Sequence, residues 1–372
     1  MKKHTSTIII SVIIIAVTII TGKGFLEQRK PEIIKRGPGV TELKHLSDWY
    51  PGLKGTRGDT EVYVLEGKEK GGTMLVLGGT HPNEPAGYMS AILLIENVTP
   101  EKGTLYVIPR ANNSGFSHTD PQEASPVSFT INKPDGSVRT FRYGSRATNP
   151  IDQWPDPDVY IHASSGQHLS GNETRNLNRG YPGRTNGTFT EKVCYGITQL
   201  IIKEKIDLTI DLHEASPEYP VINAIVAHER AMTLASDVVL GLEMQDIKIG
   251  LEPSPKNLRG LSHRELGDFT GTYAVLMEAT NAAQGRFRGK TDANLVLTGK
   301  DKYYVEAEKL GRLYVPYDEN GHPMEERVGR HLTAIGEFVF DLSMEYPDDE
   351  IIIDGIPDYQ ELLQKGIGAF LL

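Results

Sequence analysis

Cysteine is almost absent from this sequence, because Cys194 is the single one among 372 residues. A lone cysteine cannot form a disulfide within the chain, and it excludes a metal site built from several thiolates. Any metal centre must therefore use histidine and carboxylate ligands. Positive charge is also scarce: 39 lysines and arginines against 49 acidic residues give a formal net charge of −10. That balance argues against nucleic acid as a partner.

Charge is missing altogether from Thr5 to Gly22, a run that follows Lys2 and Lys3. As a helix this run would measure about 27 Å, which lies between a signal-peptide core and a membrane-spanning helix. A buried core helix is the alternative, but the position at the extreme N-terminus disfavours it. We expect a signal peptide or N-terminal membrane anchor over residues 1–23. The remainder would then be extracytoplasmic, either secreted or held at the membrane by this segment.

The rest of the chain has the composition of a globular protein, with 24% charged and 38% apolar residues. We expect a connecting segment over residues 24–55 and a single domain over 56–372, with a long insertion at about 111–171 that has little periodicity. Strands are expected at 61–67, 73–79, 104–110, 206–213, 221–228 and 272–280, and helices at 86–98, 191–205 and 326–345. This alternation predicts an α/β sheet with helices on both faces.

His81 and Glu84 lie three residues apart in GGTHPNEPAG (78–87), directly after a predicted strand. Gly, Pro and Asn gather in turns for conformational reasons alone, so a polar surface loop is one interpretation. Half of a metal site is the other, since hydrolytic zinc commonly takes two histidines and a carboxylate. The best third ligand is His213, at the end of the buried-type strand in DLTIDLHEASP. Asp211, on the same strand face, would orient a ligand imidazole.

A hydrolytic metal site also needs a base and a positive group. Glu278 ends an apolar strand in AVLMEATNA, where an unpaired charge is costly, so it is either ion-paired or functional; we expect the general base. The segment ETRNLNRGYPG (173–183) offers Arg175 and Arg179, with Asn178 beside the second. An arginine can polarise a carbonyl or bind a carboxylate, although loop arginines are usually just solvated.

Four motifs in this order resemble the succinylglutamate desuccinylase and aspartoacylase family, which belongs to the zinc carboxypeptidase-like fold. They are GGTHPNEPAG, NLNRGYPG, DLHEASP and the glutamate of the late strand, and the resemblance covers roughly residues 60–285. It implies a three-layer αβα architecture with a central mixed sheet. It also implies one Zn²⁺ per chain, held by His81, Glu84 and His213.

The same resemblance implies roles for the remaining site residues. Asn178 and Arg179 would bind a substrate carboxylate, and Glu278 would be the base. An arginine upstream of the Asn178–Arg179 pair polarises the carbonyl in such enzymes. Here two candidates stay open, Arg175 close by and Arg146 in RYGSRATNP.

Three functions compete on this evidence. The first is a zinc-dependent amidohydrolase, or deacylase, that cleaves an N-acyl amino acid. The second is an exported zinc carboxypeptidase acting on short or cell-wall peptides, which needs the same ligands and base. The third is a membrane-tethered binding protein on a decayed hydrolase scaffold, but no ligand and no base is missing. Arg286 and Arg288 follow the base closely and would hold a second anionic group of the substrate, unless they form a solvated loop.

Overall fold

The structure is a computed structural model that describes residues 2–30, 32–120, 123 and 125–372. Its centre is a nine-stranded sheet. The strands of this sheet are β1 (Glu42–His45), β2 (Glu61–Glu66), β3 (Glu69–Leu77), β4 (Thr99–Ile108), β9 (Leu208–Ala215), β10 (Ala224–Ala227), β11 (Gly250–Pro253), β12 (Tyr273–Thr280) and β13 (Ile352–Asp354). They are arranged in the order β1-β2-β4-β3-β9-β12-β10-β11, with β13 paired to β4. The sheet is mixed: β4, β3, β9 and β12 are parallel neighbours, whereas β10 pairs with β12 in the antiparallel sense.

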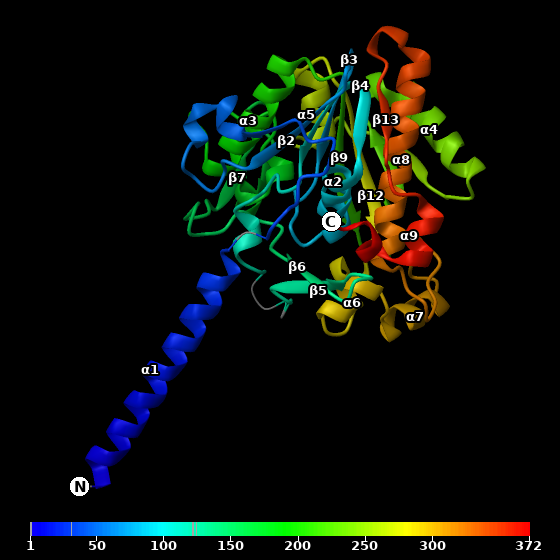
Figure 1. The fold of residues 1–372 in the computed structure, drawn as a ribbon. Helices are drawn as coiled ribbons and strands as arrows, with labels where there is room; N and C mark the ends of the chain where they lie inside the picture. The colour runs from blue at the N-terminus through cyan, green and yellow to red at the C-terminus, as the bar shows by residue number, and fades with distance from the viewer. Residues whose placement is uncertain (1, 31, 121–122, 124) are drawn as a thin grey trace.

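Helices cover both faces of this sheet. They are α2 (Pro85–Asn97), α4 (Met232–Met244) and α8 (Met324–Glu345) on one face, and α3 (Phe189–Glu204) and α5 (Ser262–Phe269) on the other. Figure 1 shows α3 and α5 on one side of the strands and α4 and α8 on the opposite side. The predicted three-layer α/β architecture is confirmed.

Strand β9 is buried on both faces, and its alternation decides which side chains reach the site. Leu208, Ile210 and Leu212 pack into the core formed with α2 and α8. Successive side chains of a strand point to opposite faces, so Asp211 and His213 face the side of α3 and α5. All eight residues of the strand are buried, including the ionisable side chains of Asp211, His213 and Glu214.

The connecting segment and the insertion contain several short elements. The 111–171 region holds two hairpins, β5–β6 and β7–β8, and β1 lies inside the segment 24–55 and pairs with β2. The bounds of the remaining elements are β5 (Ser128–Asn132), β6 (Val138–Arg142), β7 (Val159–Ile161), β8 (His168–Ser170), α6 (Ala293–Thr298), α7 (Lys302–Lys309) and α9 (Tyr359–Lys365). Strand β1 and strands β5 to β8 are three to five residues long, too short for a clear alternation of apolar residues.

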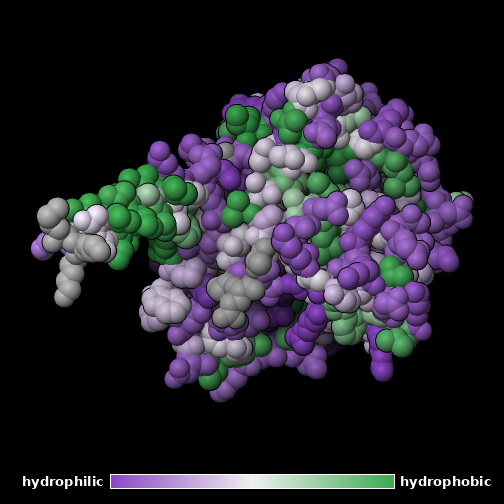
Figure 2. All heavy atoms as spheres, turned by 90° about the horizontal axis from the view of Figure 1, so that it is seen from below, coloured by the Kyte–Doolittle hydropathy of each residue, from purple (hydrophilic) through white to green (hydrophobic). Residues whose placement is uncertain are grey.

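The N-terminal helix α1 (Lys2–Gln28) extends away from the body of the molecule (Figure 1). Its residues His4–Gln28 are long and apolar enough to cross a membrane by length and composition, a test that a signal sequence also passes. Figure 2 shows it as a continuous hydrophobic projection beside a largely hydrophilic body. Isoleucines such as Ile8 and Ile20 are more than half exposed there.

Candidate metal centre

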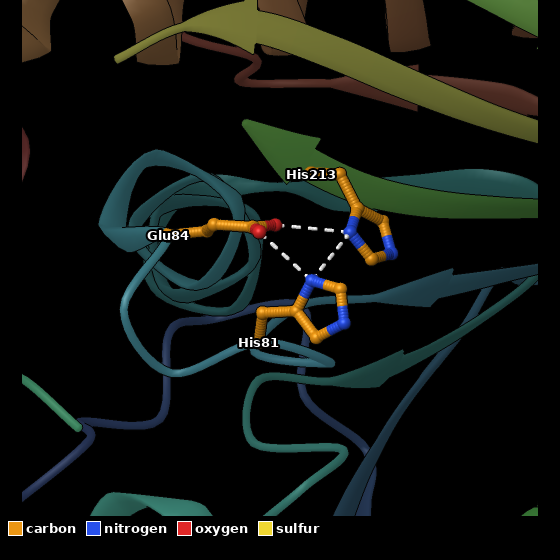
Figure 3. A group of neighbouring side chains, drawn as sticks. All are labelled: His81, Glu84 and His213. Atoms are coloured by element: carbon orange, nitrogen blue, oxygen red, sulfur yellow. Dashed lines mark hydrogen bonds and ion pairs between the residues drawn. The ribbon is translucent and has the colours of Figure 1, made fainter. Parts of the chain in front are cut away.

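Three ligand-type side chains converge in the interior of the domain (Figure 3). Nδ1 of His81 lies 2.8 Å from Oε1 of Glu84 and 3.1 Å from Nδ1 of His213. The second carboxylate oxygen of Glu84 lies 2.9 Å from the same His213 nitrogen. All three side chains are buried. Glu84 and His213 are 129 positions apart in the sequence, yet they belong to one compact group of possible ligands.

The turn after β3 brings the first two of these residues together. Gly79 adopts a φ of +66°, and a Cβ there would lie 2.9 Å from the Phe116 ring, so the position requires glycine. The chain then turns back, and the Glu84 amide donates to the His81 carbonyl at 3.0 Å. Glu84 is the N-cap of α2, and Pro85 occupies the first helical position, where the missing N–H costs nothing. The His-x-x-Glu spacing is therefore fixed by a turn leading into a helix.

The outward-facing nitrogens of both imidazoles also have polar neighbours. Nε2 of His81 lies 2.9 Å from Oδ1 of Asn176, and Nε2 of His213 lies 2.9 Å from Oδ2 of Asp211. Asp211 is held in turn by the hydroxyls of Thr80, at 2.8 Å, and Ser262, at 2.5 Å. The Asn176 oxygen places a ring proton on Nε2 of His81. The Asp211 carboxylate lies at ion-pair distance from Nε2 of His213, which has no hydrogen-bond partner among the described residues. In both rings Nδ1 faces Glu84.

This arrangement fits a divalent cation. Two imidazole nitrogens and a carboxylate point at one another, an arrangement of acceptors that a shared cation satisfies. Two histidines and one carboxylate are the ligands that hydrolytic zinc commonly takes, with a further position left for water. The described residues contain no other comparable group of histidine, cysteine and acidic side chains.

Without a metal, the pKa values of the two histidines are shifted in opposite directions. Burial lowers the pKa of His81 to about 4. Burial acts in the same direction on His213, but the carboxylates of Asp211 and Glu84 outweigh it and raise the pKa of that imidazole. His213 thus carries a proton between two carboxylates in the metal-free chain, and a metal would have to displace it.

Glu278 on β12 lies beside this group. It is the register partner of His213 on the parallel strand β9, so both side chains project from the same sheet face. Burial raises the pKa of Glu278 to about 8, with the Glu84 carboxylate acting in the same direction and the charges of His213 and Arg146 opposing it. Its Oε2 atom is buried and has no hydrogen-bond partner among the residues that the structure describes.

A cavity of about 360 Å³ opens onto the three ligands and Glu278. Arg146, Asn178 and Arg179 line it as well, which brings together seven of the eight site residues predicted from the sequence. Burial and, next, the charge of Arg146 lower the pKa of Arg179. Asn178 accepts a hydrogen bond from the Ser262 amide at 2.8 Å, which fixes its side chain at the start of α5.

Arg175 is the predicted residue that does not line the cavity. Its guanidinium makes a two-point contact with Asp156, at 2.7 and 2.9 Å, and donates to the Thr148 carbonyl at 2.9 Å. The in-plane N–H groups of the guanidinium thus hold the 148–156 segment. Of the two arginines left open by the sequence, Arg146 is the one at the cavity.

Two lining or supporting residues were missed by the sequence patterns. Asn176 lies two positions before Asn178 in the NLNR motif, so its position next to a suspected site was a usable signal. His263, on α5, also lines the cavity, and its Nδ1 lies 2.8 Å from the Ser254 hydroxyl. No strand end marks it, because it reaches the site from a short helix.

No protein-family model matches this chain, and no curated protein matches it. Solved structures do resemble it. The succinylglutamate desuccinylase from Silicibacter sp. TM1040 is 17% identical, with a TM-score of 0.37, over 61% of this chain and 55% of that chain. Tripeptide-bound cell shape determinant Csd4 from Helicobacter pylori is 12% identical, with a TM-score of 0.47, over 82% and 60%.

A metallo-carboxypeptidase from Burkholderia cenocepacia is 10% identical, with a TM-score of 0.46, over 87% of this chain and 68% of that chain. The matches to the desuccinylase and to Csd4 each span less than two thirds of the length of that protein. Succinylglutamate desuccinylases and metallo-carboxypeptidase-like proteins, the group that the four sequence motifs resemble, are among the solved structures similar to this chain.

Proposed function

We propose that this chain is a zinc-dependent hydrolase that cleaves the amide bond of an N-acyl amino acid. The observation that carries the proposal is the convergence of His81, Glu84 and His213 beside Glu278 in one cavity. Zinc held by these three ligands would supply Lewis-acid activation of water and of the scissile carbonyl.

Glu278 is assigned as the general base. A carboxylate next to the attacking water takes its proton and returns it to the leaving amine. The raised pKa of Glu278, about 8 in the metal-free chain, makes the carboxyl a competent acid for the second of these steps. A cation at the neighbouring ligands would lower that value and leave the group ionised for the first step.

The arginines divide two tasks between them. Arg146 forms no ion pair with any described residue, so its guanidinium is available to the oxygen of the scissile carbonyl, where negative charge develops. Arg179, with Asn178 beside it, is assigned to the carboxylate of the amino acid. The same assignments serve a carboxypeptidase acting on short peptides, and only the group on the acyl side of the scissile bond separates the two functions.

Metal content and turnover of a Glu278→Gln variant test this proposal together. We expect about one zinc per chain in both the native protein and the variant, because Glu278 is not a ligand. Hydrolysis of N-acyl amino acids should fall by roughly 10²–10⁴-fold in the variant, the usual contribution of acid–base catalysis. His81→Ala should lose both metal and activity. A Glu278→Gln variant with full activity would exclude Glu278 as the base, and absence of metal after zinc addition would favour a binding protein.

A further inference from the structure

The floor of the cavity changes from charged to apolar across the sheet. His213 on β9 and Glu278 on β12 form its polar part. Leu276 lies two residues before Glu278 and therefore on the same face, and its register partner on β10 is Val226. From β9 toward β10, the lining of the cavity therefore changes from the candidate metal ligands to two aliphatic side chains.

The wall above this floor is apolar as well. Pro255, Leu258 and Leu261, from the segment before α5, line the cavity, and Val221 before β10 also lines it. Leu261 and Val226 are buried, while Leu258 is half-buried at the rim. We call four of these side chains the aliphatic wall: Leu258, Leu261, Val226 and Leu276.

Hydrogen bonds attach this wall to the assigned carboxylate site. The amide of Ser262, next to Leu261, donates to Asn178, and the Tyr181 amide donates to the Gly260 carbonyl at 3.3 Å. Arg259 and Glu265 fix the same segment through contacts of 2.7 and 2.8 Å between their side chains. An amino acid with its carboxylate on Asn178 and Arg179 thus has the aliphatic wall beside it.

None of the four side chains of the aliphatic wall could pair with a second carboxylate on that amino acid, and the imidazole of His263, which also lines the cavity, already contacts the Ser254 hydroxyl. Arg286 and Arg288, the arginines considered from the sequence, do not line the cavity. Arg288 pairs instead with Glu123 and donates to Thr291 and the Gly285 carbonyl. Burying an unpaired carboxylate against aliphatic side chains is strongly unfavourable.

We infer that the amino acid on the amine side of the cleaved bond carries an aliphatic or aromatic side chain rather than an acidic one. The inference rests on the proposed function, which places the carboxylate of the substrate at Asn178 and Arg179. Its substrate class is an N-acyl derivative, or a short peptide ending in such a residue, with one carboxylate and an apolar side chain.

Ligand binding tests this inference without turnover. We would titrate the full chain in detergent, as the zinc-loaded Glu278→Gln variant, with N-acetyl-leucine and with N-acetyl-aspartate in a calorimeter. Burial of a leucine side chain is worth roughly 1.5–3 kcal/mol, so N-acetyl-leucine should bind about 10- to 100-fold more tightly. Equal or tighter binding of N-acetyl-aspartate would overturn the inference.

A substitution in the wall provides the second test. Leu258→Arg introduces a guanidinium at the half-buried rim and should move the relative affinity at least tenfold toward N-acetyl-aspartate. Leu258→Met is the matched control, because it keeps an apolar side chain of similar volume and should keep the preference for leucine. Unchanged preference in Leu258→Arg would overturn the assignment of the wall.

Hydrolysis by the native chain separates the two proposals. Preferred cleavage of N-acetyl-aspartate would uphold the hydrolase and overturn the apolar specificity. Binding of N-acetyl-leucine with the expected preference, but no cleavage of either compound by the zinc-loaded native chain, would uphold the wall and contradict the hydrolase.

Discussion

Arg146 and Arg175 are equivalent candidates by sequence, yet their guanidinium groups have different neighbours. Arg175 is fully engaged by Asp156 and the Thr148 carbonyl, whereas Arg146 lines the cavity. The sequence offered Arg175 close to the NLNR motif and Arg146 in the upstream segment RYGSRATNP, but it could not choose between them. The choice depends on Asp156, a residue of the irregular 111–171 region that no periodic pattern positions.

This difference predicts distinct phenotypes for a matched pair of variants. Arg146→Gln should lower kcat/KM by about 10²–10³-fold, the typical effect of removing one group that stabilises an oxyanion. Arg175→Gln should change kcat/KM less than about tenfold but lower the unfolding free energy by about 1–3 kcal/mol, because Asp156 loses its partner. Steady-state kinetics and denaturant unfolding measure the two quantities. Equal losses of activity would contradict the assignment of Arg146.

Asp211 contacts His213, one of the three residues of the candidate metal centre. Removing its negative charge weakens the contact that orients this imidazole, and such outer partners typically contribute 10–100-fold to metal affinity. We expect Asp211→Asn to weaken zinc binding by about that factor, measured by competition with a chromophoric chelator at fixed pH. Asp207→Asn is the control, since that carboxylate precedes β9, at the end of the strand away from His213, and receives hydrogen bonds from Thr73. Equal zinc affinity in Asp211→Asn and the native chain would argue against a supporting role.

At the scale of single elements, α8 carries a row of like charges. Glu337, Asp341 and Glu345 follow one another at a spacing of four residues, which places them on one helix face. Burial raises the pKa of Asp341 to about 6, and Glu337, Asp237 of α4 and Glu345 add to the rise. Because the folded pKa lies above the ordinary value of 3.8, ionisation of this group is less favourable in the folded state than in the unfolded chain.

The sign of the pH dependence follows directly. The contribution of protonated Asp341 to stability is complete below about pH 4 and is lost as the pH rises through 6. Asp341→Asn should therefore stabilise the fold above pH 7 and make no difference at pH 4. The side chain is half-buried, so solvent screening limits the gain to about 1 kcal/mol or less.

Thermal unfolding at several pH values measures this effect. A gain of about 1 kcal/mol corresponds to a rise in Tm of roughly 2–4 °C or less for a domain of this size. Glu101→Gln, an exposed carboxylate on β4, is the control and should leave the pH dependence unchanged. A variant that is stabilised equally at pH 4 and pH 8 would contradict the assignment to Asp341.

The elements that could be predicted are those in which local pattern and tertiary burial agree. Strands β9 and β12 are apolar runs ended by His213 and Glu278, so both the strands and the two site residues follow from the sequence. Helix α5 could not be found in this way. Its sequence SHRELGDF has few apolar residues, and its position depends on burying Leu266 and on the contact between Glu265 and Arg259, outside the helix. His263, Leu258 and Leu261, which lie on α5 or directly before it, were missed for the same reason.

The whole molecule combines a hydrophilic body with one exposed apolar helix (Figure 2). We propose that α1 holds the catalytic domain at the outer face of a membrane, unless it is cleaved as a signal peptide. Lys2 and Lys3 before the apolar run favour an N-terminus that stays on the cytoplasmic side. Hydrogen bonds stabilise the junction between the helix and the body. Arg142 on β6 donates to the carbonyls of Glu27, at 2.6 Å, and Lys30, at 3.1 Å.

This junction sets where the chain can be shortened. A chain starting at Gly24 keeps Glu27 and Lys30 as acceptors for Arg142, so we expect it to fold, to bind about one zinc and to stay in solution. The full chain should sediment with membranes and require detergent. In the full chain, Ile13→Lys places a charge at the helix centre, which costs about 2.5–3.5 kcal/mol and should release part of the protein. Ile33→Lys, at an isoleucine exposed beyond the helix, is the matched control and should sediment like the native chain.

The mass of the recovered protein distinguishes the two fates of α1. An intact mass in the membrane fraction indicates an anchor, and a soluble product lacking about the first 23 residues indicates a cleaved signal. A cleaved signal places the metal centre outside the cytoplasm, as does an anchor whose N-terminus stays on the cytoplasmic side. An intact full chain that stays soluble without detergent would contradict both, because a helix with isoleucines more than half exposed needs lipid or another apolar cover. The substrate would then have to be sought among the N-acyl amino acids of the cytoplasm, with the same cavity and the same ligands.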